Sequence, residues 1–248
     1  MTTLASWDGG ALPNTGGTAP TVSGDEFTTA VNALSYGYWT LGAAAPTNSL
    51  RFRFKTPSAW PSASFTIATV SAGAGSILNR MNLGGSGAPG QVRLVRQAGT
   101  QVAASSTGAI DLSTWYRGEL QMNSGGNLLR CAVFPLGSDV ALWESGAISG
   151  ATGATGTRLS LGNGANGASP PATIAAMSFS HFLATDTYGA WLGRDEDDPL
   201  PPPDVGSYRF FNGTTLLDLT PRGEFDGTVL HPVEVRGYWD GTALHPLT

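Results

Sequence analysis

The sequence is poor in cysteine, lysine and charge. Cys131 is its only cysteine, Lys55 its only lysine, and 12% of its residues are charged. A single cysteine excludes an intrachain disulfide, so stability must come from a packed core and from backbone hydrogen bonds. Cys131 stands in the apolar run 128–134, which predicts a buried, unreactive thiol.

The sequence also lacks the patterns of membrane spans, secretory signals and nucleic-acid-binding patches. No apolar run approaches the ~20 residues of a membrane span. Residues 1–10 lack the basic and then apolar order of a secretory signal. The net charge is −5, and the strongest basic run, residues 51–55, alternates Arg51, Arg53 and Lys55 with apolar residues. We read that run as one exposed strand face, not as a nucleic-acid patch. The sequence predicts a protein made in a cytoplasm, with neither nucleic acid nor membrane as partner.

The residues that are abundant favour strands and turns. The chain has 34 Gly and 16 Pro, which break helices and shape turns. Apolar and polar residues alternate with a period of two in many short segments, the pattern of half-buried strands. The predicted strands are 50–55, 64–71, 91–96, 115–122, 127–134 and 173–183. No apolar period of 3.6 persists over three turns, so the fold class predicted is all-β, an antiparallel sandwich.

Groups that carry catalysis or hold metals are scarce. Glycosidases need paired acids, whereas Glu119 and Glu144 each stand singly. His181 has no partner at metal-ligand spacing. The run 162–167 formally matches a dinucleotide fingerprint, but prolines follow where a helix would have to begin. The sequence therefore predicts no catalytic residues, no metal ligands and no enzyme.

Tryptophans are the best candidates for sugar contacts, because the apolar face of a sugar ring stacks on a flat aromatic ring. Trp39 and Trp115 stand in strand patterns and are predicted to pack in the core. Trp60 and Trp143 lie nearer to turns. They are our candidate glycan-binding residues.

A linker and a repeat divide the chain. Residues 195–206 read DEDDPLPPPDVG, an acidic, proline-rich segment typical of an extended, solvated linker. We therefore predict a β-sandwich over 1–194 and a second module over 207–248. The second module repeats an aromatic–(Asp/Asn)–Gly–Thr unit every 14 residues, and Asn-Gly and Asp-Gly favour hairpin turns. The predicted assembly residues are Phe211, Asn212, Gly213, Phe225, Asp226, Gly227, Trp239, Asp240 and Gly241.

Residues 1–195 resemble the concanavalin A-like (laminin G-like) jelly rolls. The run 113–120, a turn and a strand ending at Phe134-Pro135 resemble their central hairpin; 173–183 resembles their closing strand, and 24–27 their opening strand. The resemblance implies two antiparallel sheets packed face to face and an edge that binds sugar or a structural calcium ion. The acid pair of the hydrolytic relatives is missing.

The C-terminal repeats resemble the tails of minor tail proteins from phages of actinobacteria, as in YWDGTALHPL at 238–247. This resemblance implies a virion protein located in the tail, with other virion proteins and host cell-wall glycan as partners. A homo-oligomer, preferably a trimer, would bury repeats too small to fold alone. Two alternatives stay open: a capsid decoration or head fibre protein, and a polysaccharide-degrading enzyme of the same fold.

Overall fold

The structure is a computed structural model that describes residues 1–73, 76–96, 99–125, 127–150, 154–165 and 173–195, with the backbone of six short strands between 208 and 246. The chain divides into two compact units, Met1–Pro199 and Leu200–Thr248. The described residues contain strands, turns and no α-helix. Accordingly, the described part of the chain offers no helix of the length and apolarity that a membrane crossing requires.

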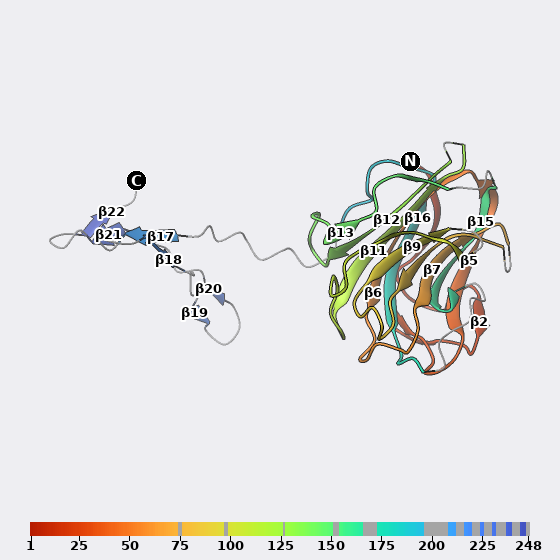
Figure 1. The fold of residues 1–248 in the computed structure, drawn as a ribbon, viewed down its shortest axis with the longest axis horizontal. Helices are drawn as coiled ribbons and strands as arrows, with labels where there is room; N and C mark the ends of the chain where they lie inside the picture. Colours follow the sequence, from red (N-terminus) through yellow and green to blue (C-terminus); the bar gives the residue numbers. More distant parts are fainter. Residues whose placement is uncertain are drawn as a thin grey trace. The chain divides into compact units, whose positions relative to one another are not determined.

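One layer of the first unit is a nine-stranded antiparallel sheet of order β13-β12-β11-β6-β16-β4-β3, in which β1 also pairs with β16 and β14 with β12 (Figure 1). Its strands are β1 (Thr3–Trp7), β3 (Thr21–Ser23), β4 (Glu26–Thr28), β6 (Thr47–Lys55), β11 (Trp115–Asn123), β12 (Leu128–Pro135), β13 (Trp143–Glu144), β14 (Ile148–Ser149) and β16 (Ser178–Thr185).

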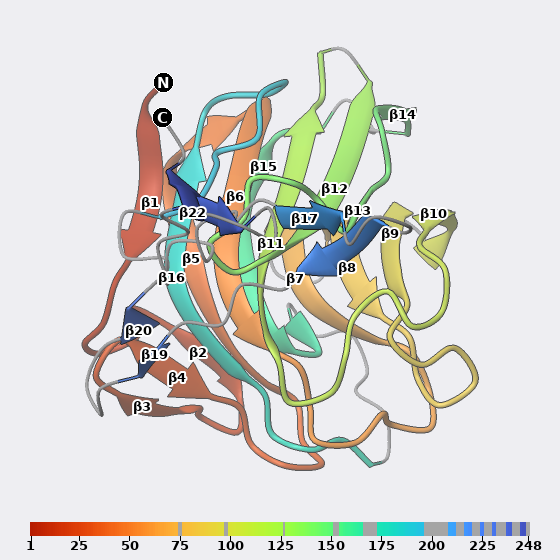
Figure 2. The same ribbon diagram turned by 90° about the vertical axis from the view of Figure 1, so that its left-hand side faces the viewer.

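The other layer is a seven-stranded antiparallel sheet of order β10-β9-β8-β7-β15-β5-β2 (Figure 2). Its strands are β2 (Thr15–Gly17), β5 (Ser35–Ala45), β7 (Phe65–Ser71), β8 (Ile77–Leu83), β9 (Val92–Arg96), β10 (Gln101–Ala104) and β15 (Gly156–Asn163).

Aromatic and branched side chains from both sheets fill the space between the layers. Trp39 of β5 stacks on Phe182 of β16 with ring centroids 4.2 Å apart, and so joins the two sheets. Phe27 and Phe179 stack at 5.2 Å within the nine-stranded sheet. Cys131 is fully buried in this core, as predicted, and burial raises the pKa of its thiol.

The predicted all-β sandwich is confirmed, and the predicted hairpin is β11–β12, paired continuously from Tyr116↔Pro135 to Asn123↔Leu128. One predicted boundary is wrong: the strand expected at 173–183 begins only at Ser178 and runs to Thr185. The sequence analysis placed Trp39 of β5 in a strand pattern without giving that strand its bounds, and it missed β8 and β15. Glycine and alanine occupy much of β5, and glycine occurs near both ends of β15, so their apolar period is weak.

The second unit contains three two-stranded antiparallel hairpins, one for each repeat. They are β17 (Tyr208–Phe211) with β18 (Leu216–Leu219), β19 (Glu224–Phe225) with β20 (Leu230–His231), and β21 (Gly237–Trp239) with β22 (Leu244–Pro246). In each, the repeat's aromatic residue ends the first strand and faces a leucine of the second: Phe211↔Leu216, Phe225↔Leu230 and Trp239↔Leu244. The turn residues Asn212, Gly213, Asp226, Gly227, Asp240 and Gly241, like residues 196–206 of the predicted linker, lie outside the described residues.

Candidate functional site

The outer face of the seven-stranded sheet is polar, because alternation along each strand turns its apolar residues toward the core. In β9, Val92 and Leu94 are fully buried in the core, while Arg93 lies on the opposite face. In β8, Met81 and Leu83 point inward, which leaves Arg80 and Asn82 outside. Period-two geometry thus places the strand polar residues on one surface.

Strand registers align these outer residues into rows across the sheet. The first row joins Tyr38 to Ser160, then Thr69, Arg80, Val95 and Gln101. The second joins Thr66 to Asn82, Arg93 and Ala104. Neighbouring strands lie about 4.8 Å apart, so the first row, which runs from β5 to β10, is roughly 24 Å long. We call the residues of these two rows, together with Tyr36 and Arg158, the polar face.

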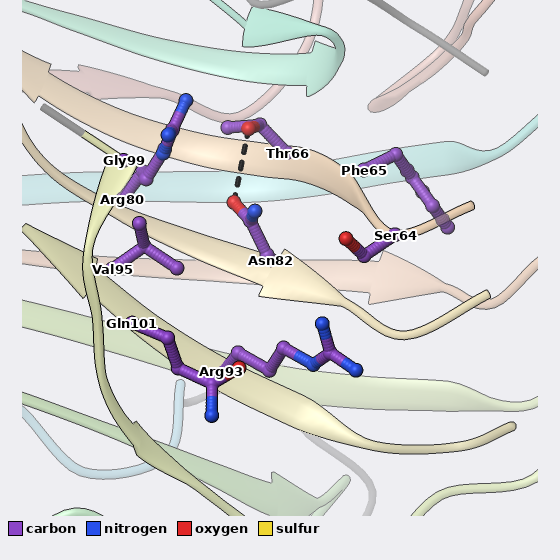
Figure 3. Close-up of a pocket in the computed structure, with 9 residues that line it drawn as sticks. All are labelled: Ser64, Phe65, Thr66, Arg80, Asn82, Arg93, Val95, Gly99 and Gln101. Atoms are coloured by element: carbon purple, nitrogen blue, oxygen red, sulfur yellow. Dashed lines mark hydrogen bonds between the residues drawn. The ribbon is translucent and has the colours of Figure 1, made fainter. Parts of the chain in front are cut away.

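A hollow of about 280 Å³ lies at the β7–β10 end of the polar face. It is lined by Ser64, Phe65, Thr66, Arg80, Asn82, Arg93, Val95, Gly99 and Gln101 (Figure 3). The Thr66 hydroxyl donates a hydrogen bond of 2.9 Å to Asn82 Oδ1, and in Figure 3 this pair lies between Arg80 and Arg93. Arg93 Nε donates to Gln91 Oε1 at 2.6 Å. These contacts hold the amide and guanidinium groups at the opening.

Two hydroxyls on the floor of the polar face have no hydrogen-bond partner among the described residues. Thr69 and Ser160 are both 0% exposed, and neither Oγ atom is bonded. Buried polar groups in proteins are nearly always satisfied, and an unsatisfied one costs about 1–3 kcal/mol. The Nε atoms of Arg80 and Arg158 are also buried without a partner. The polar face thus keeps unused hydrogen-bonding groups at its centre.

An aromatic cluster ends the polar face on β5. The Arg158 guanidinium lies 3.4 Å from the centroid of the half-buried Tyr38 ring and 6.0 Å from that of Tyr36. The Tyr36 ring lies over Gly16 of β2, where a Cβ would overlap it. Stacked guanidinium and phenol groups are rigid, flat and amphipathic. They are suited to contact a ring-shaped ligand.

The outer face of the nine-stranded sheet is different, because residues 187–195, here called the strap, cross it. Glu119 of β11 is fully buried, and its carboxylate accepts backbone hydrogen bonds from Leu192 at 2.6 Å and Gly193 at 3.2 Å. Gln121 binds the strap through Ala190 O and the Gly189 N–H. Burial raises the pKa of Glu119 to about 7, against the opposite effect of these N–H groups and of Arg117.

The strap corrects two expectations drawn from sequence. Arg51 does not lie on a free strand face: its Nη1 donates to the carbonyls of Gly193 and Arg194, and its Nη2 pairs with Asp195 at 2.8 Å. Asp195 is consequently not a solvated linker residue. Both errors have one cause, since a sequence pattern shows which residues face outward but not what later covers them.

The two predicted glycan-binding tryptophans do not come together with the polar face. Trp60, between β6 and β7, is half-buried and packs against the core. Trp143 begins β13, packs partly against the core and, with Trp191, lines a second hollow of about 440 Å³. The prediction that Trp39 is core is confirmed. The same prediction for Trp115 is wrong: its neighbour Tyr116 points inward, so Trp115 faces out and is half-buried.

That second hollow, between β12 and the strap, combines aromatic rings with paired charges. The Trp191 indole donates to Glu144 Oε2 at 3.0 Å. The Arg130 guanidinium lies 3.5 Å from the Trp191 ring centroid and 3.8 Å from the Glu144 carboxylate. The Trp191 indole and the Glu144 carboxylate of this hollow are therefore already paired with each other.

The residues present do not fit the structural calcium ion implied by the jelly-roll resemblance. Calcium takes six to eight oxygen ligands, several of them carboxylates. Among the described ranges, no three His, Cys, Asp or Glu residues gather closely enough to hold a metal. Asp25 instead lies 3.6 Å from the His181 imidazole.

The sequence analysis missed Arg80, Asn82 and Arg93, the residues that line the first hollow. The alternation of 91–96 already placed Arg93 on a polar face. The strand that carries Arg80 and Asn82 was not predicted, and only the cross-strand register shows that the three residues are neighbours.

Solved structures with the same two-layer architecture place the fold in a known class. The VIP36 exoplasmic/lumenal domain in its Ca2+/Man3GlcNAc-bound form matches with a TM-score of 0.51 and 8% identity, over 76% of this chain and 92% of that chain. Basic winged bean lectin with Tn-antigen matches with a TM-score of 0.51 and 7% identity, over 74% of this chain and 99% of the lectin. The sandwich is a concanavalin A-like jelly roll.

Two further matches are to parts of larger chains. The binding domain of Botulinum neurotoxin DC in complex with SialylT matches with a TM-score of 0.50 and 8% identity, over 76% of this chain and 48% of that chain. A Trypanosoma rangeli sialidase matches with a TM-score of 0.46 and 12% identity over 69% of this chain, which spans 26% of the sialidase. No protein-family model and no curated protein sequence matches this chain.

Proposed function

We propose that this chain is a non-enzymatic glycan-binding protein that holds its saccharide along the polar face. The observation that carries the proposal is the two rows of mostly polar side chains across six neighbouring strands, which end in a hollow lined by Arg80, Asn82, Arg93 and Gln101. A saccharide presents many hydroxyls, each both donor and acceptor. Such a ligand would satisfy groups that the fold leaves open.

The side chains of the polar face suit this role by type. Asn82 and Gln101 offer planar amides, and Arg80 and Arg93 offer forked donors, all in or beside one hollow. Tyr38, at the far end of the first row, offers a ring face to sugar C–H groups. Two proteins that share the fold, the VIP36 domain and winged bean lectin, are described with a saccharide bound.

The carboxylates support binding rather than hydrolysis. Glycoside hydrolysis requires two carboxyl groups on either side of the scissile bond, and the strands of the seven-stranded sheet contain no Asp or Glu. Glu119, on the other sheet, is buried beneath the strap with both oxygens engaged. An assay for new reducing ends should detect no cleavage of a bound polysaccharide. Turnover by the wild type would end the non-enzymatic proposal, and its survival in a Glu119→Gln variant would place the active site away from Glu119.

We further propose that the chain is a phage minor tail protein whose ligand is host cell-wall glycan. The resemblance of the 14-residue repeats to such tails supports this location. In the structure, each described repeat forms one hairpin with the same pairing of aromatic residue to leucine. Identical units with little core of their own are suited to assembly with other virion proteins or in a homotrimer.

Two experiments test these proposals separately. The full chain, titrated with soluble cell-wall polysaccharide in a calorimeter, should bind. Asn82→Ala should weaken binding at a temperature where the variant is folded, although loss of the Thr66 hydrogen bond also lowers its stability. No binding to any polysaccharide would overturn the glycan proposal. Mass spectrometry and density maps of purified virions should find the chain in the tail. Its location on the capsid would instead support the decoration-protein alternative.

A further inference from the structure

The two sheets carry their charges very differently. The charged residues of the seven-stranded sheet are all arginines: Arg80, Arg93, Arg96 and Arg158. The nine-stranded sheet mixes both signs, with Glu26, Glu119 and Glu144 among its basic residues. A protein of net charge −5 thus keeps one entire sheet free of carboxylates.

Three arginines of the nine-stranded sheet have a carboxylate neighbour, whereas among the described residues those of the polar face have none. Arg51 pairs with Asp195 at 2.8 Å, Arg117 approaches Glu119 at 3.3 Å, and Arg130 approaches Glu144 at 3.8 Å. Among the described residues, no carboxylate oxygen lies within 4.0 Å of Arg80, Arg93 or Arg158. Their recorded partners are neutral: Gln91 for Arg93 and the Tyr38 ring for Arg158.

Arg80 is the most constrained of the three. It occupies the first row between Thr69 and Val95, and its guanidinium lies close to the Gly99 backbone, where a Cβ would stand 3.0 Å from Nη2. Burial lowers its pKa, because a desolvated cation without a counter-ion is disfavoured. A bound anion would restore the missing interaction.

The three outward arginines also lie within reach of one ligand. Arg93 and Arg80 stand on adjacent strands, two residues apart in register, a diagonal of roughly 7–8 Å. Arg158 lies two strands beyond Arg80, past β7. A linear polymer with an acidic group on successive units could contact them in turn.

From this charge distribution we infer that the polar face selects an acidic glycan, one whose sugar units carry carboxylate or phosphate groups. Arg80 and Arg93 bind the acidic group at the hollow, Asn82 and Gln101 bind neighbouring hydroxyls, and Arg158 binds a second acidic group near Tyr38. The inference rests on the proposed glycan-binding function and adds the class of ligand to it.

Matched ligands test the inference by calorimetry on the full chain. Oligogalacturonate is compared with its methyl ester, and phosphomannan with mannan, so that the members of each pair share their sugar units and differ at the acidic group. We expect the acidic member of at least one pair to bind about tenfold or more tightly, and the pair that responds identifies carboxylate or phosphate. Added salt should weaken binding of the acidic member only.

Variants connect the selectivity to the arginines. Arg80→Gln and Arg93→Gln should each lower the affinity for the acidic ligand by about tenfold and leave the neutral one nearly unchanged. Arg96→Gln is the control, because it removes one positive charge from β9, the strand that also carries Arg93. Arg96 pairs with Asn79, which points between the sheets, so it lies off the polar face.

The outcomes separate the inference from the function on which it rests. If the acidic and neutral members bind equally, and both variants bind as tightly as the wild type, acidic selectivity is overturned. Glycan binding itself would then still stand. An equal loss in Arg96→Gln would show a general charge effect and also overturn the assignment. Absence of binding to all four ligands and to cell-wall polysaccharide would overturn both. Circular dichroism of each variant verifies the fold.

Discussion

The Glu119 carboxylate accepts a hydrogen bond of 2.6 Å from the backbone N–H of Leu192, and this contact ties the strap to the outer face of the nine-stranded sheet. The same strap engages Arg51 and Gln121. One outer face of the sandwich is therefore occupied by the protein's own chain. The arginines of the polar face on the other sheet have no carboxylate partner among the described residues, and we therefore place ligand binding there.

Glu119 should make stability depend on pH. Its pKa in the folded protein is about 7, against an ordinary 4.5, so its contribution is fully present below about 4.5 and is lost as the pH rises through 7. Relative to Glu119→Gln, the wild type should lose on the order of 3 kcal/mol of unfolding free energy between pH 4.5 and 8. Urea unfolding of both proteins at several pH values measures this difference; a difference that does not change with pH would contradict it.

Thr69→Val should stabilise the protein and leave its glycan binding nearly unchanged. The substitution keeps the shape and removes a buried hydroxyl that has no partner, so the unfolding free energy should rise by about 1 kcal/mol. Glycan affinity should change little, because this hydroxyl is fully buried beneath the polar face. Ser160→Ala is the matched second test on β15. If both substitutions lower stability, the hydroxyls already have partners in the free protein.

The Tyr38 ring should matter for binding more than its hydroxyl. Tyr38→Phe keeps the ring and the 3.4 Å contact with Arg158, and should bind glycan nearly as well as wild type. Tyr38→Ala should weaken binding by roughly 1–2 kcal/mol through loss of the ring face. Calorimetric titration of the two variants decides this point. Equal affinities would exclude Tyr38 from the site.

Substitution of Trp143 separates a structural tryptophan from a binding one. Trp143 packs partly against the core, so Trp143→Ala should lower the unfolding free energy by about 1–3 kcal/mol. If the polar face is the site, glycan affinity at a temperature where the variant is folded should stay unchanged. A large loss of affinity with little loss of stability would support the sequence-based prediction for Trp143 and move the site to the second hollow.

Removal of residues 207–248 should change assembly and leave the sandwich folded. Among the residues whose burial the structure describes, those of the hydrophobic core all lie before residue 195, and the first unit ends at Pro199. The shortened chain should unfold cooperatively at nearly the wild-type temperature. In analytical ultracentrifugation the shortened chain should be a monomer. The full chain should be an oligomer, and we favour a trimer. If the ratio of measured mass to the mass of one chain is the same for both proteins, assembly does not depend on residues 207–248.

The sequence predicted features that depend on a single strand. It did not predict features that depend on how several strands pair. Alternation alone predicted β6, β7, β9, β11 and β12, because each turns a regular apolar row toward the core. The 14-residue period predicted the three hairpins. The polar face could not be predicted, since Arg80 and Asn82 stand on a strand with weak alternation. Their position beside Arg93 depends on register, a long-range property. The strap was missed for the same reason, because it is fixed by side chains of β6 and β11.

Nuclear magnetic resonance can test directly whether the glycan binds to the polar face. Backbone amide shifts of the labelled full chain are recorded while oligogalacturonate or cell-wall polysaccharide is added. We expect the largest shifts on the strands of the polar face, above all at Thr69, Arg80, Asn82 and Arg93. Shifts confined to Trp143, Trp191 and the strap, with the polar face unchanged, would contradict this expectation.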